Sequence, residues 1–277
     1  MLRVGVRLPA TIGQVGEYLA DVVALEAAGA DSIWLGDAAV QPAVGRRPDP
    51  QLEPWPLLAA MAAVTHRVRL GASATSAGAW PPALFAATVT TLERLSGGRV
   101  VVGLGLGLEP EQLVDQGLRF EDRGRRLDEF IDLVRRLWSG SHEPFEGEFY
   151  KVPAIQLAPG VRPQGPPILI GAGGDPDYER AARVGDGLIQ PGVPEEQVAT
   201  GFARARELRA AAGREGDFEL WVEVSTPPDR GAWRRTLATY EATGATGVIA
   251  SWDPRLVDLL RNPDTEDDRT DLLIATG

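Results

Sequence analysis

The chain has 277 residues, of which 44% are hydrophobic and 24% are charged, a composition typical of a globular protein that buries a sizeable core. The absence of cysteine excludes disulfide bonds and thiolate metal sites. The formal net charge of −11 argues against nonspecific binding to nucleic acids or anionic membranes. No stretch approaches the roughly 18 apolar residues of a membrane span, and no signal-peptide pattern opens the chain, so we expect a cytoplasmic protein.

Strand-like and helix-like patterns alternate along the whole chain. Apolar runs predict strands over residues 2–8, 32–35, 68–73, 99–104, 167–170, 187–190, 218–224 and 247–250. Apolar residues at helical spacing, with prolines at several starts, predict helices over residues 15–28, 55–65, 81–95, 123–137, 176–184, 195–212, 232–243 and 254–261.

This alternation predicts a parallel sheet, since parallel neighbours need crossover connections. Eight such units in about 260 residues favour a (β/α)8 TIM barrel over a doubly wound sheet. Residues 141–166 break the rhythm with aromatic residues among glycines and prolines, which predicts an inserted excursion between helix 4 and strand 5. We expect residues 1–262 to form one barrel domain and residues 263–277 to form an acidic C-terminal tail.

Glycine recurs at every second position where the fourth strand ends, at Gly103, Gly105 and Gly107. Because glycine has no side chain to pack, the pattern indicates either a structural bulge or a close approach of backbone to a ligand. A second strand ends in the glycine-rich segment 171–174, just before a helix that starts with Asp175 and Pro176. Exposed N–H groups at that start favour an anion, although Asp175 adds a negative charge there and can instead cap the helix.

Both glycine-rich strand ends fall at the C-terminal mouth, where barrel enzymes build their active sites. Asp37 ends the second strand and Glu109 follows the glycine strand, so both are candidate catalytic residues. A loop aspartate and a helix-start charge are the simpler interpretations of these two carboxylates. Trp80 follows the third strand and either lines the mouth or packs. His66 lies at the bottom face and His142 in the excursion, so the two histidines assemble neither a catalytic triad nor a metal site.

Taken together, these segments resemble the luciferase-like monooxygenase superfamily, which includes coenzyme F420-dependent oxidoreductases and FMN-dependent monooxygenases. The resemblance covers nearly the whole chain. It is carried by an ordered set of motifs: PWPLLAA at 54–60, THRVRLG at 65–71, LERLSGGR at 92–99, GLGLG at 103–107, residues 123–138, GEFY at 147–150, PPILIG at 166–171, AA at 181–182 and GDG at 185–187.

The resemblance implies a deazaflavin or flavin at the barrel mouth, a small-molecule substrate and a homodimer. It implies a non-prolyl cis peptide at Ser73-Ala74 that supports the cofactor ring, with Asp37 matching a common aspartate at the end of the second strand. The cofactor-binding residues would then be Asp37, Ser73, Ala74, Gly105, Gly107, Gly171, Ala172, Gly173 and Gly174, the last four at the phosphate. Trp80 and Leu108 would shape the substrate pocket.

Two positions depart from the family pattern. Ala38 stands where many F420-dependent members carry histidine, and Leu108 stands where sugar-phosphate dehydrogenases carry glutamate, with Glu109 one residue later. An acid/base pair is therefore missing or shifted, although hydride transfer depends more on positioning the cofactor. We expect an F420-dependent oxidoreductase. The alternatives are an FMN-dependent monooxygenase, which the net charge favours because F420 has a polyanionic tail, and a non-catalytic flavin-binding protein.

Overall fold

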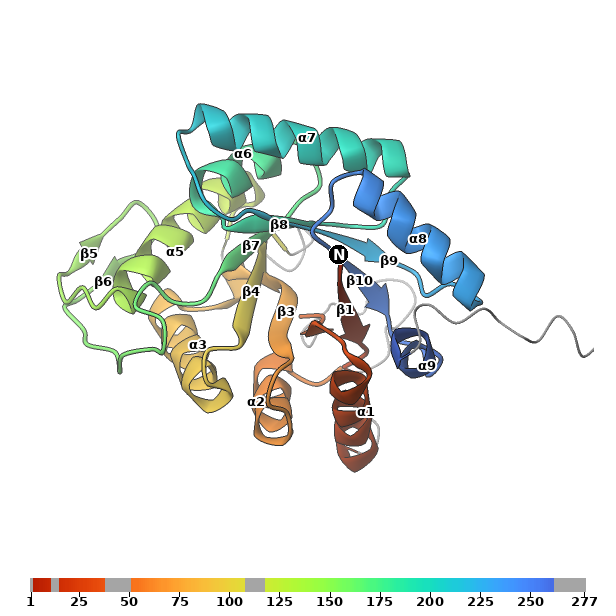
Figure 1. The fold of residues 1–277 in the computed structure, drawn as a ribbon. Helices are drawn as coiled ribbons and strands as arrows, with labels where there is room; N and C mark the ends of the chain where they lie inside the picture. The colour runs from red at the N-terminus through yellow and green to blue at the C-terminus, as the bar shows by residue number, and fades with distance from the viewer. Residues whose placement is uncertain (1, 11–14, 38–50, 108–117, 262–277) are drawn as a thin grey trace, which may run out of the picture.

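The computed structural model describes residues 2–10, 15–37, 51–107 and 118–261. Within this part of the chain, eight parallel strands close into a barrel (Figure 1), which confirms the predicted (β/α)8 architecture. The closure is direct, because β1 (Arg3–Leu8) pairs with β2 (Ser32–Leu35) on one side and with β10 (Gly247–Ser251) on the other. The strands between them are β3 (Arg69–Ser76), β4 (Val100–Gly105), β7 (Ile168–Gly171), β8 (Gly187–Gln190) and β9 (Glu219–Val224).

A helix follows each barrel strand, and the helices surround the barrel (Figure 1). They are α1 (Val15–Ala28), α2 (Pro54–Val64), α3 (Pro82–Ser96), α5 (Arg123–Trp138), α6 (Asp175–Val184), α7 (Glu195–Ala211), α8 (Arg230–Ala242) and α9 (Leu256–Arg261). Proline opens α2 and α3, and Gly97 ends α3 in the left-handed region at φ 68°, as helix boundaries favour. None of the described helices is long and apolar enough to cross a membrane.

The excursion after α5 is a small hairpin, as the aromatic and glycine-rich segment predicts. Strands β5 (Phe145–Glu146) and β6 (Lys151–Val152) pair antiparallel, apart from the barrel. Glu129 of α5 holds their turn, because its carboxylate accepts the N–H groups of Glu148, Phe149 and Tyr150 at 2.9, 3.0 and 2.7 Å. The hairpin is therefore anchored to the outer layer of helices.

The inside of the barrel is filled at its middle. Trp34 and Trp221 are fully buried there and meet edge to face, with ring centroids 6.0 Å apart. They form a cluster with Val101, Leu169, Ile189 and Ile249 from the other strands. Two glycines make room for the indoles: a Cβ on Gly71 would lie 2.6 Å from the Trp34 ring, and one on Gly247 would lie 2.4 Å from the Trp221 ring. The larger core lies outside, between the strands and the helices.

Candidate active site

A bulge in β3 shapes the C-terminal mouth of the barrel. The pairing of β3 with β4 shifts register between Ala72 and Thr75, and the peptide bond between Ser73 and Ala74 is cis. This cis bond confirms the position that the family resemblance implies. The sequence pattern predicts that the strand ends at Ser73, whereas β3 continues to Ser76, because the chain pairs with β4 again beyond the bulge.

The alternating glycines of β4 pack against this bulge. A Cβ on Gly103 would lie 2.5 Å from the Ala72 carbonyl oxygen, and one on Gly105 would lie 3.0 Å from the Ala74 Cβ. Gly107, at φ 45°, faces Ser76 just as closely, at 2.5 Å. The alternating glycines therefore lie against a bulge in the neighbouring strand β3. A Cβ on Gly171 would lie 3.2 Å from the Ala74 methyl, so two glycines flank that methyl at the floor of the mouth.

Arg7 fixes the bulged peptide from inside the barrel. Its Nη2 donates to both the carbonyl oxygen and the hydroxyl of Ser73 at 3.1 Å, and it also pairs with the carboxylate of Glu223. Ser73 Oγ donates to the same carboxylate at 3.5 Å. Burial raises the pKa of Glu223, and the Arg7 guanidinium opposes that rise. The sequence analysis did not predict Arg7 or Glu223 as residues of the site. The signal available in the sequence is a charged residue inside a largely apolar strand.

Asp37 stands at the edge of the mouth, beyond the end of β2. Burial raises the pKa of Asp37, and the nearby Ser76 N–H and Trp80 indole oppose that rise. Its Oδ2 atom is buried and finds no hydrogen-bond partner among the described residues. Trp80 also packs edge to face on Phe85, with centroids 5.8 Å apart. The structure therefore brings two predicted residues, Asp37 and Trp80, near each other and shows the packing role weighed for Trp80, whereas its place at the mouth stays a prediction.

Glu53 joins this edge and was not predicted. It caps α2, since its Oε2 accepts the Trp55 N–H at 2.9 Å, whereas its Oε1 is buried without a partner in the described part of the chain. Burial, with a further contribution from the nearby charge of Asp37, raises the pKa of Glu53 to about 7. Glu53 and Trp80 line the same cleft of about 350 Å³ between α2 and α3. The signal available in the sequence is a glutamate directly before a proline-led helix.

The glycine-rich segment after β7 is less open to an anion than its sequence indicates. The N–H of Ala172 donates to Ile189 of β8, and the N–H of Gly173 donates to Asp177 Oδ2 at 3.0 Å. The residue capping α6 is Gly174, so the alternative of Asp175 as a cap is wrong; Asp177 satisfies the loop instead. A carboxylate therefore already occupies part of the space in which a phosphate would bind.

We expect the substitution Asp177→Asn to strengthen binding of a phosphate-bearing flavin by roughly 2–5-fold, because it removes a negative charge at a helix start. Fluorescence titration measures the binding of FMN and of riboflavin to wild type and variant. Because the two flavins differ only by the phosphate, the comparison gives the contribution of the phosphate to affinity. Asn retains an acceptor for the Gly173 N–H, and Arg180 keeps its second carboxylate partner, Asp128, at 2.7 Å. Equal gains for both flavins would place the effect elsewhere than at the phosphate.

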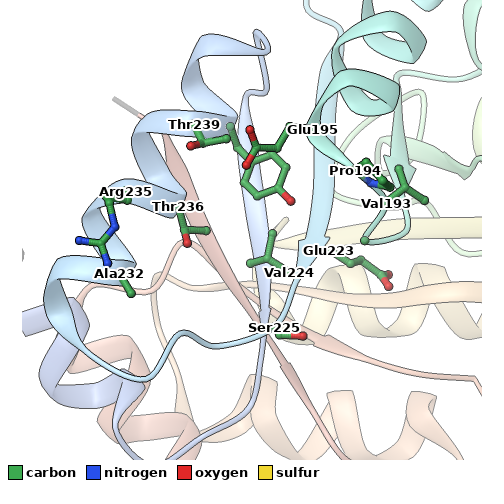
Figure 2. Close-up of a pocket in the computed structure, with 12 residues that line it drawn as sticks. Val193, Pro194, Glu195, Glu223, Val224, Ser225, Ala232, Arg235, Thr236 and Thr239 are labelled. Carbon is green, nitrogen blue, oxygen red and sulfur yellow. The ribbon is translucent and has the colours of Figure 1, made fainter.

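A cleft of about 560 Å³ adjoins the mouth between the start of α7 and the inner face of α8. Figure 2 shows Val224 pointing toward α8, while Glu223 on the same strand points the other way, toward the barrel. Polar side chains line the cleft, among them Glu195, Arg235, Thr236, Thr239 and Tyr240. The predicted cofactor residues lie outside this cleft. Among the described residues, Glu223 is the one that belongs both to the cleft and to the cluster around Ser73.

Several predicted positions fall outside these contacts. Ala38, Leu108, Glu109 and the tail at 263–277 lie outside the described residues. His66 and His142 are exposed, and the backbone N–H of His66 donates to Glu26 at 2.8 Å. Across residues 2–10, 15–37, 51–107 and 118–261, no three His, Asp or Glu side chains come together in a way that could hold a metal ion.

The fold and the mouth define a (β/α)8 barrel whose candidate site lies at the C-terminal ends of the strands. Residues 2–270 match the family described as luciferase-like monooxygenase, and the chain belongs to that family. An uncharacterised protein of Mycobacterium tuberculosis is 36% identical over 217 residues, which are 78% of this chain and 72% of that protein.

An F420-dependent glucose-6-phosphate dehydrogenase of Amycolatopsis mediterranei is 33% identical over 196 residues, covering 68% of this chain and 57% of that enzyme. Among solved structures, an F420-dependent secondary alcohol dehydrogenase bound to an F420-acetone adduct superimposes with a TM-score of 0.82. At 16% identity over 95% of this chain and 98% of that one, the likeness shows a shared fold. The family comprises F420- or flavin-dependent oxidoreductases and monooxygenases.

Proposed function

We propose that this protein is an oxidoreductase that transfers a hydride between coenzyme F420 and a small organic substrate. The observation that carries the proposal is the floor of the mouth, where Arg7 holds the Ser73-Ala74 peptide and glycines flank the Ala74 methyl. Such a floor presents backbone and one methyl group, which suits a flat ring approaching closely. The sequence similarity to an F420-dependent dehydrogenase supports the choice of cofactor.

The residues present fit the ring better than they fit the phosphate. Ser73, Ala74 and Gly105 would hold the ring, with Asp37 at its edge. Gly107 would contribute through Ser76, against which it packs. The segment 171–174 would hold the phosphate only where its N–H groups are free of Asp177. When bound, the deazaflavin supplies a carbon that accepts or delivers the hydride.

The remaining residues have roles that follow from their contacts. Arg7 keeps the Ser73 peptide in place, so the ring would meet a fixed surface. Trp80, which lies near Asp37, would form one wall of the substrate pocket. Asp37 has a buried oxygen with no described partner, and in this proposal it would exchange a proton with a substrate at the mouth. Leu108 and Glu109 keep their proposed roles as pocket residue and catalytic residue.

An FMN-dependent monooxygenase is the second candidate, and the net charge of −11 favours it because F420 carries more negative charge than FMN. The same floor would accept either ring. A protein that binds a flavin without catalysis remains the third reading, motivated by Ala38 and Leu108. The homodimer and the cytoplasmic location stay predictions.

Titration of the purified protein with F420 and with FMN, followed by turnover assays, tests these readings. We expect F420 to bind at least about tenfold more tightly than FMN, a difference of about 1.4 kcal/mol. Tight binding of FMN alone, with oxygen consumption once the flavin is reduced, would replace the proposal with the monooxygenase. Binding of neither cofactor would rule out both enzymes, and binding without turnover over a broad substrate panel would leave the carrier.

A further inference from the structure

Within the described residues, the inside of the barrel holds an arginine–glutamate pair on each side of the tryptophan cluster. Alternation along β9 turns Glu219, Trp221 and Glu223 inward, while the leucine and valines between them belong to the outer core. Glu219 begins the strand and pairs with Arg69, whereas Glu223 lies near its C-terminal end and pairs with Arg7. The two pairs have the same composition but differ in which of their atoms remain free.

The pair at the N-terminal end has its carboxylate fully occupied. Arg69 donates to both oxygens of Glu219, through Nη1 at 3.0 Å and through Nη2 at 2.9 Å. The Trp221 indole donates to Oε2 of the same carboxylate at 2.7 Å, and Arg3 adds an ion pair at 3.0 Å. Such a two-pronged arrangement is the strong geometry of an arginine–carboxylate pair. These contacts give Glu219 a structural role.

The pair at the C-terminal end is only half occupied. Arg7 makes its hydrogen bonds through one nitrogen, Nη2, which serves Glu223 Oε1 and both the carbonyl and the hydroxyl oxygen of Ser73. Nε of Arg7 is buried and has no partner among the described residues. Within the same part of the chain, Nη1 of Arg7 and Oε2 of Glu223 have no hydrogen-bond partner and are not buried. The pair therefore still offers one donor nitrogen and one acceptor oxygen.

The free atoms of this pair are reached from the C-terminal side of the barrel. The Arg7 side chain is 31% exposed and that of Glu223 is 25% exposed, although both point into a closed barrel. Trp34 and Trp221 are fully buried and close the barrel between this pair and the N-terminal end. Glu223 also lines the cleft of about 560 Å³ that adjoins the mouth (Figure 2). The exposure of the pair thus arises at the mouth and its adjoining cleft, where a substrate would enter.

The pair and the proposed ring floor occupy opposite arcs of the mouth. Arg7 and Glu223 come from β1 and β9, and β10 lies between these two strands. The proposed floor for the cofactor ring comes from β3, β4 and β7, on the other side of the barrel. Arg7 joins the two arcs, because its Nη2 reaches Ser73 on β3. This placement suits a substrate that lies beside the cofactor.

The free atoms favour a neutral polar group over an ion. A carboxylate is bound best by two nitrogens of one guanidinium, but Nη2 of Arg7 is already engaged and Nε is buried. The charge of Glu223 would also repel a carboxylate, and the charge of Arg7 would repel a cation. A carbonyl oxygen next to an N–H matches both free atoms, since the oxygen accepts from Nη1 and the N–H donates to Oε2.

We propose that Arg7 and Glu223 bind the substrate through a neutral amide or lactam group, whose carbonyl oxygen accepts from Arg7 and whose N–H donates to Glu223. The amide group is not the reacting group, so no bond forms or breaks at the pair. Its binding does not require the cofactor, whereas its part in a reaction rests on the proposed function. The pair thus both fixes the Ser73 peptide and anchors the substrate beside the ring floor.

The first test measures the binding of small probes to the protein without cofactor, by ligand-observed NMR titration. Pyrrolidinone is a lactam that presents a carbonyl oxygen beside an N–H. Butyrolactone has the same ring without the N–H, and cyclopentanecarboxylate is an anion of similar size. We expect wild type to bind pyrrolidinone with a Kd in the millimolar range, about 3–10-fold more tightly than either of the other probes.

Variants of the two ion pairs make this test specific. Glu223→Gln keeps the shape of the side chain but leaves Arg7 without its anion, so this variant is expected to bind cyclopentanecarboxylate more tightly than pyrrolidinone. Glu219→Gln is the matched control, because it removes the carboxylate of the occupied pair on the same strand and should keep the wild-type order of probes. Arg7→Lys retains the charge without Nη1 and should weaken pyrrolidinone binding about fivefold, which tests the proposal even if Glu223→Gln does not fold.

Three outcomes of the first test would overturn the proposal. Wild type could prefer the carboxylate, bind the lactam and the lactone equally, or bind none of the probes. The same probe order in Glu223→Gln and in Glu219→Gln would also overturn it, since a merely structural role would not change the order. Failure of both F420 and FMN to bind would count against the proposed function alone.

The second test is kinetic and uses the protein loaded with the cofactor that binds in titration. For substrates that carry an amide, we expect Glu223→Gln to raise KM about tenfold and to leave kcat within about twofold of wild type. This split follows because the anchoring contact is made equally in the ground state and the transition state. An unchanged KM, or turnover confined to substrates without an amide, would overturn the proposal.

Discussion

Replacing Arg7 with methionine is expected to lower the free energy of unfolding by about 2–3 kcal/mol, because it leaves Glu223 without its cation. The guanidinium is 31% exposed and the carboxylate 25% exposed, so the loss is smaller than for a fully buried pair. The Ser73 carbonyl and hydroxyl lose their donor in the same variant. Urea unfolding measures the first effect, and flavin titration should show weaker binding as the cofactor floor loosens.

The effect of Arg7→Met should depend on pH. Burial already raises the pKa of Glu223, and removing Arg7 raises it further. Stability that depends on a protonated Glu223 is present at low pH and lost as the pH rises, so the deficit should be larger at pH 8 than at pH 5. The double variant with Glu223→Gln is the matched control, because it removes both charges. A deficit that is equal at both pH values, or equal in the double variant, would contradict this account.

The substitution Gly103→Ala is expected to cost about 3 kcal/mol, at the upper end for overpacking. The added Cβ would meet backbone rather than a side chain: it would lie 2.5 Å from the Ala72 carbonyl oxygen and 3.1 Å from the Ser73 Cα. Neither atom can move freely, since Ala72 pairs with Val102 and Arg7 holds Ser73. Urea unfolding at neutral pH gives the stability, and the same samples report flavin affinity.

Gly36→Ala provides the comparison for Gly103→Ala. A Cβ at Gly36, just after β2, would have no heavy atom within 4 Å. The free energy of unfolding of Gly36→Ala should therefore remain within about 0.5 kcal/mol of that of wild type. If both variants lose similar stability, the contact with the β3 bulge does not account for the loss at Gly103. If Gly103→Ala is as stable as wild type, the bulge tolerates more than its contacts indicate.

The sequence predicted the elements and the barrel well because both depend on local pattern. Apolar periodicity and helix-start prolines placed each element within three residues of its observed bounds. The position of the cis bond came from the family resemblance alone. The end of β3 was misplaced because the bulge depends on how β4 packs, and no periodicity within residues 68–76 encodes that contact.

The polar contacts at the mouth could not be read from the sequence in the same way. Arg7 and Glu223 lie 216 positions apart and meet only because the barrel closes. Glu53 and Asp37 are separated by a segment outside the described residues, and nothing in their spacing predicts that one acts on the other. Asp37 was predicted because it ends a strand, whereas the burial that raises its pKa is a property of the assembled mouth.

The filled interior of the barrel has a consequence for the order in which ligands bind. Trp34 and Trp221 close the middle of the barrel, so its C-terminal opening gives no passage to the other end. A ring seated on Ala74 would have protein against one face and could be approached only from the other. With a cofactor seated in this way, we expect the cofactor to enter before the substrate and the product to leave before the cofactor exchanges. The tryptophan pair thus predicts ordered binding that needs no moving part.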